Sequence, residues 1–304
     1  MKTEVKIGSL ALRNPILAAS GTFGFGREMA VLQDLDKLGG ICSKGITLKP
    51  RLGNLTPRVA ETAGGMLNSV GLQNPGLDFF LREELPFMRS LGCAVIVNAA
   101  GHDESDYLEL CRRLDQADID AIELNLSCPN VSAGCMLIGS DKSQVESLVA
   151  KVRRLTRKPI WAKLTPNVTS ITEMARAAES GGADAVVLIN TLLGMAIDHR
   201  SRRPILRNNT GGLSGPAIKP IALRMVAEVY RAIQIPIIGA GGIICGADAL
   251  EFLIAGASAV EIGTANLISP TACQDILAEM IEIAAIEGAA SLAEYTGSLQ
   301  LWNP

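Results

Sequence analysis

The sequence has few aromatic residues, few histidines and no excess of basic charge. Aromatic side chains make up 4% of the 304 residues, and the formal net charge is −3. Nucleic acids and anionic membranes are bound by basic surfaces, and single strands also by stacked aromatic side chains. The composition therefore argues against both kinds of partner. Only His102 and His199 are present, so chemistry that needs several histidines is poorly supplied.

Long apolar runs and paired cysteine motifs are also missing. No apolar run approaches the roughly 20 residues that span a bilayer. Residues 1–7 alternate and carry charges, unlike a signal peptide, so we expect a cytoplasmic protein without a membrane segment. The seven cysteines are odd in number, and none are spaced Cys-x-x-Cys. This pattern disfavours a disulfide framework, a zinc knuckle or an iron–sulfur cluster within the chain.

A repeated pattern of strand and helix runs along the chain. Short, continuous apolar runs precede helix-like stretches, as expected of parallel strands covered on both faces. Eight such runs lie at residues 15–19, 40–43, 94–97, 121–124, 160–162, 185–189, 237–239 and 259–262. Amphipathic helices are predicted at 103–116, 142–156, 170–180, 219–232 and 271–287. The pattern predicts an α/β fold, a (β/α)8 TIM barrel, with an open doubly wound sheet as the alternative.

The remaining segments predict an N-terminal hairpin and three long loops. Residues 2–14 read as a hairpin that turns at Gly8-Ser9 and closes the end of the barrel opposite the site. Long loops rich in Gly, Asn, Thr, Pro and Arg follow strands 2 and 6, at 46–75 and 192–216, and another follows strand 4. Such loops commonly carry function. No linker is visible, so residues 1–304 are expected to form one barrel domain.

Polar residues follow most of the predicted strands. The residues that end the eight runs are, in order, Ser20, Lys44, Asn98, Asn125, Lys163, Asn190, Gly241 and Gly263. Any one of them is equally well explained as a solvated loop residue. Active sites of such barrels lie at the carboxyl ends of the strands, where these side chains would converge. Convergent polar groups favour a binding site.

Glycines mark one edge of this expected site. The run Gly-Ala-Gly-Gly-Ile at 239–243 follows strand 7, and Gly263-Thr264 follows strand 8. Barrels bind phosphate at these positions through backbone N–H groups, although tight turns alone would also explain the glycines. No histidine cluster or carboxylate pair stands out, so a cofactor that carries the chemistry itself is favoured over paired acids or a metal. Flavin mononucleotide (FMN) fits, with Asn98, Asn125 and Lys163 around its ring and the Lys163 cation stabilising the anionic reduced flavin.

Cys128 follows strand 4 in the run Asn-Leu-Ser-Cys-Pro-Asn. A free cysteine is most often a small buried residue. Here the loop is rich in Gly, Ser and Asn and lies on the expected catalytic face. An ordinary thiol titrates near ~8.5 and can take up a proton once its environment matches the task. We therefore predict that Cys128 is the catalytic base, in preference to Cys135, which is farther from the strand end.

Several motifs resemble the dihydroorotate dehydrogenase family and keep its order along essentially the whole chain. They include Ser-Gly-Thr-Phe-Gly from Ser20, Asn-Ser-Val-Gly-Leu-Gln-Asn-Pro-Gly from Asn68, and Glu-Leu-Asn-Leu-Ser-Cys-Pro-Asn from Glu123. The resemblance implies an FMN barrel that oxidises (S)-dihydroorotate to orotate in pyrimidine (UMP) biosynthesis. It also implies that Cys128 removes the C5 proton while hydride leaves C6 for the flavin.

The resemblance further implies individual contacts and no metal site. FMN contacts fall on Ser20, Lys44, Gly45, Asn98, Asn125, Lys163, Ile189, Gly215, Gly241, Gly242, Gly263 and Thr264. Substrate contacts fall on Lys44, Asn68, Ser69, Val70, Gly71, Leu72, Asn125, Asn190 and Thr191, with Asn130 as a further one.

Within the family, the chain is most similar to class 1B catalytic subunits, which use NAD. A cysteine at the base position indicates a soluble class, and the runs at 130–141 and 210–220 favour the NAD type. Ser132, Cys135 and Ile138 depart from the usual lysine, glycine and phenylalanine. The resemblance implies a homodimer within a heterotetramer, whose partner subunit carries FAD and a 2Fe-2S cluster. The alternatives are a fumarate-using class 1A enzyme, a dihydropyrimidine dehydrogenase-like enzyme, and a non-catalytic phosphate-binding barrel.

Overall fold

A closed barrel of eight parallel strands forms the centre of the computed structural model, which describes residues 1–126 and 138–302. The barrel strands are β3 (Ile16–Ala18), β4 (Gly40–Cys42), β7 (Ala94–Ala99), β8 (Ala121–Asn125), β9 (Ile160–Lys163), β10 (Ala185–Leu188), β15 (Ile237–Ala240) and β16 (Ala259–Ile262). Pairing of β16 with β3 closes the ring. The predicted (β/α)8 barrel is confirmed, and the open sheet is excluded.

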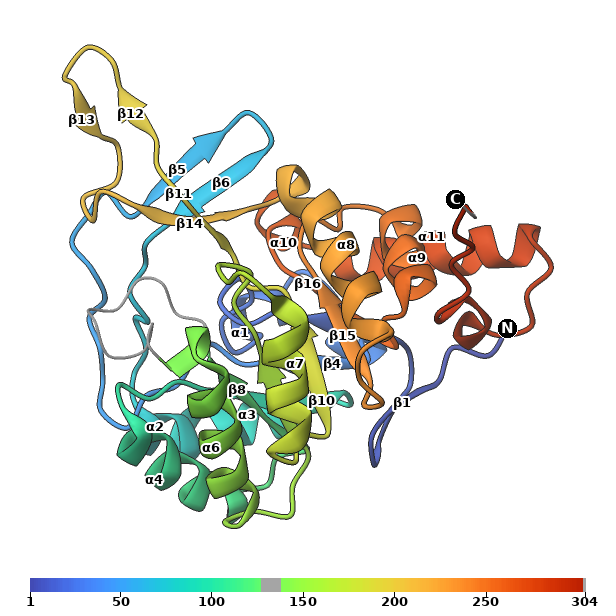
Figure 1. Cartoon of the computed structure of the whole chain (residues 1–304), viewed down its shortest axis with the longest axis horizontal. Coiled ribbons are helices and arrows are strands. Elements are labelled where there is room, and N and C mark those ends of the chain that lie inside the picture. The colour runs from blue at the N-terminus through green and yellow to red at the C-terminus, as the bar shows by residue number, and fades with distance from the viewer. Residues whose placement is uncertain (127–137, 303–304) are drawn as a thin grey trace.

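Helices lie around the barrel (Figure 1). The longer ones are α4 (Glu104–Asp115), α6 (Lys142–Arg153), α7 (Ile171–Ser180), α8 (Lys219–Tyr230), α9 (Gly246–Ala255) and α11 (Ala272–Ile286). Shorter helical segments are α1 (Arg27–Ala30), η1 (Leu35–Lys37), α2 (Leu77–Phe79), η2 (Phe80–Glu84), α3 (Leu85–Ser90), η3 (Pro216–Ile218), α10 (Ala265–Ile268) and η4 (Leu292–Tyr295). All five predicted helices are present. Within the described ranges, no helix is long and apolar enough to cross a bilayer.

Side-chain caps fix where three of these helices begin. The carboxylate of Asp103 accepts a hydrogen bond from the backbone N–H of Asp106 at the start of α4, and Asp141 caps α6 in the same way. The hydroxyl of Ser170 accepts from the N–H of Glu173 at the start of α7. Such caps satisfy N–H groups that have no partner within the helix.

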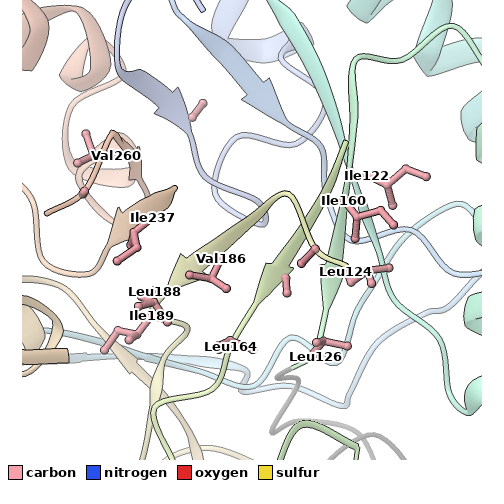
Figure 2. Packing of buried hydrophobic residues seen from close by; sticks show 14 of the residues in the cluster. Ile122, Leu124, Leu126, Ile160, Leu164, Val186, Leu188, Ile189, Ile237 and Val260 are labelled. Carbon is pink, nitrogen blue, oxygen red and sulfur yellow. The ribbon is translucent and has the colours of Figure 1, made fainter. Parts of the chain in front are cut away.

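Apolar side chains pack on both sides of the barrel wall. Figure 2 shows Leu124, Ile160, Val186 and Ile237 of the outer layer, which packs against the helices. A second cluster fills the barrel and includes the buried indole ring of Trp161. Because both faces of each strand are covered, the strands read as continuous apolar runs rather than alternating ones.

The N-terminal hairpin closes one end of the barrel. It pairs β1 (Val5–Ile7) with β2 (Leu10–Leu12) and turns at Gly8, whose φ of 60° lies in the left-handed region. Ile7 and Leu12 are buried in the same cluster as the barrel interior. Gly8 lies against Asp184, the residue before β10, so the hairpin covers the amino ends of the strands as predicted.

The long segments predicted after strands 2 and 6 follow β4 and β10, and they carry short strands that the sequence pattern does not predict. They supply β5 (Val59–Thr62), β6 (Gly65–Asn68), β11 (Leu192–Gly194) and β14 (Gly211–Ser214), which form one antiparallel sheet in the order β11-β14-β6-β5. The two-residue strands β12 (Ile197–Asp198) and β13 (Arg203–Pro204) make a hairpin that projects from the molecule (Figure 1). The segment expected as a loop after β8 falls largely in 127–137, outside the described residues.

This added sheet depends on contacts between distant parts of the chain. Gly212 of β14 pairs with Asn68 of β6. A Cβ atom on Gly65 would lie 1.9 Å from the carbonyl oxygen of Ser214, so only glycine permits this approach. Short, glycine-rich strands with remote partners carry almost no local signal, which is why the pattern along the chain does not predict them.

Candidate active site

A cavity of about 390 Å³ lies at the carboxyl ends of the barrel strands. Its walls include residues that end or closely follow β3, β4, β9, β10 and β15, together with the last residues of the added sheet strands β6 and β14. Small-molecule sites usually fall between about 300 and 1,000 Å³, so the cavity has room for a cofactor or a substrate. Its position matches the catalytic face of such barrels.

The cavity brings together every residue predicted to contact FMN: Ser20, Lys44, Gly45, Asn98, Asn125, Lys163, Ile189, Gly215, Gly241, Gly242, Gly263 and Thr264. Most residues predicted to contact the substrate line it as well: Lys44, Asn68, Val70, Gly71, Leu72, Asn125, Asn190 and Thr191. The binding roles of all these residues stay predictions.

Ser69 is the exception among the predicted contacts. It is fully buried and does not line the cavity. Its backbone N–H donates to the carbonyl of Arg58, and its own carbonyl accepts from the Asn54 amide. The neighbours Asn68 and Val70 line the cavity, whereas Ser69 does not. Cys128 and Asn130 lie outside the described residues.

Glycines form one edge of the cavity. Gly215, Gly241 and Gly242 have φ values of 98°, 125° and 81°, in the region that favours glycine. A Cβ atom on Gly242 would lie 2.8 Å from the backbone nitrogen of Lys219, and one on Gly215 would lie 2.6 Å from the Cα of Gly65. Thr264 donates a hydrogen bond of 2.8 Å to the Ser214 hydroxyl beside them. This edge exposes backbone that side chains would cover, which suits a phosphate group.

Replacing Gly242 with alanine is expected to weaken FMN binding by roughly 10- to 100-fold, because a displaced backbone donor to a charged group costs about 1.5–3 kcal/mol. Gly288→Ala is the matched control. Gly288 also has a positive φ, 77°, but a Cβ atom there would meet nothing within 4 Å. Fluorescence titration of the flavin-free protein with FMN measures both variants. Equal affinities for the two variants would show that this edge does not bind the phosphate.

The cavity floor is built on a buried amide network. Asn125 donates a hydrogen bond of 3.1 Å from Nδ2 to Oδ1 of Asn98, and Nδ2 of Asn98 donates to Oε1 of Glu123. The hydroxyl of Tyr107 donates to the backbone carbonyl of Asn125 at 2.6 Å. Because an ionised carboxylate can accept but not donate hydrogen bonds, the Asn98 amide must turn its Nδ2 toward Glu123, which fixes its orientation. The floor is therefore held in one arrangement before any ligand binds.

Two buried carboxyl groups lie next to Lys163. Its Nζ lies 2.6 Å from Oε2 of Glu261 and 3.6 Å from Oε1 of Glu123. All three side chains are at most 8% exposed, and the Sγ of Cys42 donates to Glu123 at 3.2 Å. The expectation that no carboxylate pair stands out is therefore wrong. One sequence signal was available, since a glutamate interrupts each of the apolar runs of β8 and β16, and buried charges need partners.

The pKa values of this cluster are set by burial and by mutual charge. Burial alone would lower the pKa of Lys163, but the attraction of Glu123 and Glu261 outweighs it and raises that pKa. Burial would raise the pKa of Glu123, but Lys163 and three hydrogen bonds lower it. Burial and the charge of Glu123 raise the pKa of Glu261 well above its ordinary value. Burial also raises the pKa of Cys42, so this thiol stays neutral.

A metal ion is not required to balance this cluster. Ligand atoms of Cys42, Glu123 and Glu261 lie within 4.8 Å of one another, and no other such group occurs in the described parts of the chain. The ammonium of Lys163 already supplies a positive charge among them. A further cation would have to overcome its repulsion.

Fold and cavity together define the class of protein: a (β/α)8-barrel enzyme whose site has a phosphate-type glycine edge and a floor of amides and ammonium groups. The family model described as dihydroorotate dehydrogenase matches residues 2–284. The chain therefore belongs to the dihydroorotate dehydrogenase family, as its motifs predict.

Individual relatives agree with this assignment. The chain is 52% identical over 298 residues to the dihydroorotate dehydrogenase B (NAD(+)) catalytic subunit of Trichlorobacter lovleyi, covering 98% of both chains. It is 54% identical over 273 residues to the protein of the same name from Alkaliphilus oremlandii, covering 90% of both. A crystal structure of the enzyme from Eimeria tenella in complex with ferulenol superposes with a TM-score of 0.82. It shares 24% identity and covers 98% of this chain and 88% of that one, so it supports the fold alone.

Proposed function

We propose that this chain is the catalytic subunit of an NAD-type dihydroorotate dehydrogenase, which oxidises (S)-dihydroorotate to orotate in pyrimidine biosynthesis. The observation that carries the proposal is the single cavity that joins a glycine edge to a floor of amides and lysines. The two catalytic subunits named above, each more than half identical in the matched region, support the same activity. Residues 1–304 would then form one FMN-binding barrel domain.

The residues around the cavity fit FMN. Gly215, Gly241, Gly242, Gly263 and Thr264 would hold the phosphate, where added side chains at Gly215 and Gly242 would clash with backbone. Ser20, Lys44, Gly45, Asn98, Asn125, Lys163 and Ile189 would surround the ring. When bound, FMN supplies the hydride acceptor. The contribution of the protein is orientation by the fixed amides and a positive charge from Lys163 at the cavity floor.

The substrate would lie against the wall formed by Asn68 and residues 70–72 on one side and by Asn190 and Thr191 on the other. Dihydroorotate carries ring amides and one carboxylate. Asparagine side chains both donate and accept hydrogen bonds, which matches ring amides, and the Lys44 ammonium matches the carboxylate. Cys128 would act as the base that removes the C5 proton, and Asn130 would contact the substrate.

Electrons would leave this chain through a partner subunit. Two of the relatives are named as catalytic subunits, which implies a second subunit in those proteins. We infer that this partner carries FAD and a 2Fe-2S cluster, passes electrons to NAD, and joins a homodimer of this chain in a heterotetramer. The five described cysteines support a separate carrier, since four are buried and they form no cluster together.

Anaerobic titration of the purified chain with dihydroorotate tests the proposal. The protein is expected to be yellow and to be bleached by dihydroorotate, and NAD is expected to be reduced only when the partner subunit is added. Efficient oxidation by fumarate without a partner would assign the chain to class 1A. Turnover of dihydrouracil but not of dihydroorotate would indicate a dihydropyrimidine dehydrogenase-like enzyme. A colourless protein that binds no flavin after reconstitution would refute a flavin enzyme altogether.

A further inference from the structure

The buried carboxyl pair beneath the cavity has too few hydrogen-bond donors for two ionised groups. Oε1 of Glu123 accepts from the Asn98 amide and from the Cys42 thiol, and Oε2 of Glu261 accepts from Lys163. The other two oxygens, Oε2 of Glu123 and Oε1 of Glu261, are buried and have no donor among the described residues. A buried carboxylate oxygen without a donor is costly.

A proton held by the pair removes this deficit. Ligand oxygens of Glu123 and Glu261 lie within 4.8 Å of each other, so the two carboxyl groups are close neighbours. When one of two such groups is protonated, their mutual repulsion is removed and the protonated group becomes a hydrogen-bond donor. Charge leads to the same result. The titratable groups that face one another here are Cys42, Glu123, Lys163 and Glu261, and the thiol is neutral. One ammonium against two carboxylates would leave an excess negative charge in the barrel interior, whereas one added proton makes the cluster neutral.

We propose that Glu123 and Glu261 share one proton and together act as positioning residues for Lys163, holding its ammonium at the cavity floor with a single negative charge beside it. An ammonium has three N–H donors, of which the 2.6 Å bond to Glu261 uses one. Because Glu261 also lines the cavity, its charge state acts directly on whatever binds there. The proposal rests on the proposed function, in which that ligand is FMN and becomes more negative when reduced.

The proton resides mainly on Glu261. Glu123 receives hydrogen bonds from Asn98 and Cys42, which favour its ionised form. Within the part of the chain that the structure describes, Glu261 accepts a hydrogen bond only from Lys163. When it is protonated, its hydroxyl can donate to Glu123 while its carbonyl oxygen accepts from the ammonium. In this arrangement each of the four buried carboxyl oxygens has a hydrogen-bond partner.

Infrared spectroscopy of the flavin-free protein at pH 8 tests the shared proton directly. The expected result is a C=O band of a protonated carboxyl that shifts when the protein is labelled with ¹³C-glutamate. Glu261→Gln and Glu123→Gln should each abolish the band, because the remaining carboxyl then pairs with Lys163 in ionised form. Glu146→Gln, at an exposed position, is the matched control and should keep it. Absence of the band in the unmodified protein overturns the proposal, even if neither variant folds.

The flavin provides a second readout. Glutamine at 261 mimics a neutral carboxyl, so Glu261→Gln should leave the ratio of the dissociation constants of oxidised and reduced FMN unchanged. If both carboxyls were ionised, this variant would remove a negative charge and shift that ratio in favour of reduced FMN by about tenfold or more. A neighbouring charge typically changes the equilibrium of an ionisable group by about 10- to 1,000-fold. That outcome would also refute the shared proton. Failure of the protein to bind FMN would refute the proposed function but would leave the infrared result standing.

Discussion

Replacing Cys128 with alanine is expected to leave FMN bound and to slow its reduction by dihydroorotate by about 10²–10⁴-fold, the usual contribution of a positioned base. The side chain would be lost from the substrate side of the site, while the residues proposed to hold FMN are untouched. The substrate must lose its C5 proton as hydride leaves C6. Without a base in the site, water has to accept that proton, and this slower proton transfer limits the rate. Anaerobic stopped-flow absorbance of the flavin measures the rate.

Two variants accompany this measurement. Cys245→Ala replaces a half-buried cysteine outside the cavity lining and should reduce flavin at the normal rate. Cys135→Ala tests the other cysteine of the same loop and is also expected to be normal. Near-normal flavin reduction in Cys128→Ala would remove Cys128 from its role, and slow reduction in Cys135→Ala would move the base to that residue.

Replacing Lys163 with methionine is expected to lower the free energy of unfolding by about 3–5 kcal/mol at pH 8, because breaking a buried ion pair leaves an uncompensated charge. Glu123 and Glu261 would remain in the barrel interior with no cation beside them. Urea unfolding followed by circular dichroism measures the loss. Lys142→Met is the control, since Lys142 pairs with Glu173 on the surface at 60% and 52% side-chain exposure. Exposed pairs of this kind contribute at most about 1 kcal/mol.

The penalty should also depend on pH. In the unmodified protein, Lys163 and hydrogen bonds hold the pKa of Glu123 below its ordinary value despite burial. Without Lys163, burial prevails and this pKa rises. A carboxyl whose pKa in the folded state lies above its unfolded value of ~4.3 stabilises the fold at low pH. This contribution is lost as the pH rises from the unfolded pKa through the folded pKa. Lys163→Met should therefore be less destabilised near pH 5 than at pH 8, and a penalty independent of pH would show that no buried carboxylate had been stranded.

The two experiments address different parts of the site. Replacing Cys128 is expected to change the rate of one chemical step. Replacing Lys163 is expected to change the stability of the fold and the charge at the cavity floor. Glu123→Gln added to Lys163→Met should restore part of the lost stability, because it replaces the stranded carboxylate by an amide that the Asn98 and Cys42 donors can still reach. Residues in contact couple in this way, whereas distant ones add.

The strands of the barrel and the residues that follow them can be predicted from the sequence because each is a local feature. A run such as Ala121–Asn125 is apolar since both of its faces are covered, and it ends in Asn125 because the strand end faces a polar cavity. The same reasoning placed Lys44, Lys163 and Asn190 in one site, and their order along the chain carries the family resemblance.

Other features were decided only by the tertiary structure. The sheet β11-β14-β6-β5 exists because Gly212 meets Asn68 across a long stretch of intervening chain. Glu123 and Glu261 look like isolated interruptions of two apolar strands, and only closure of the barrel brings them to one ammonium. Strand identity is determined by neighbours in sequence, whereas pairing, register and the protonation of a buried group are determined by neighbours in space. Local patterns in the sequence therefore predict the barrel and the ring of residues at its carboxyl end, whereas only the folded structure places Glu123 and Glu261 beside Lys163.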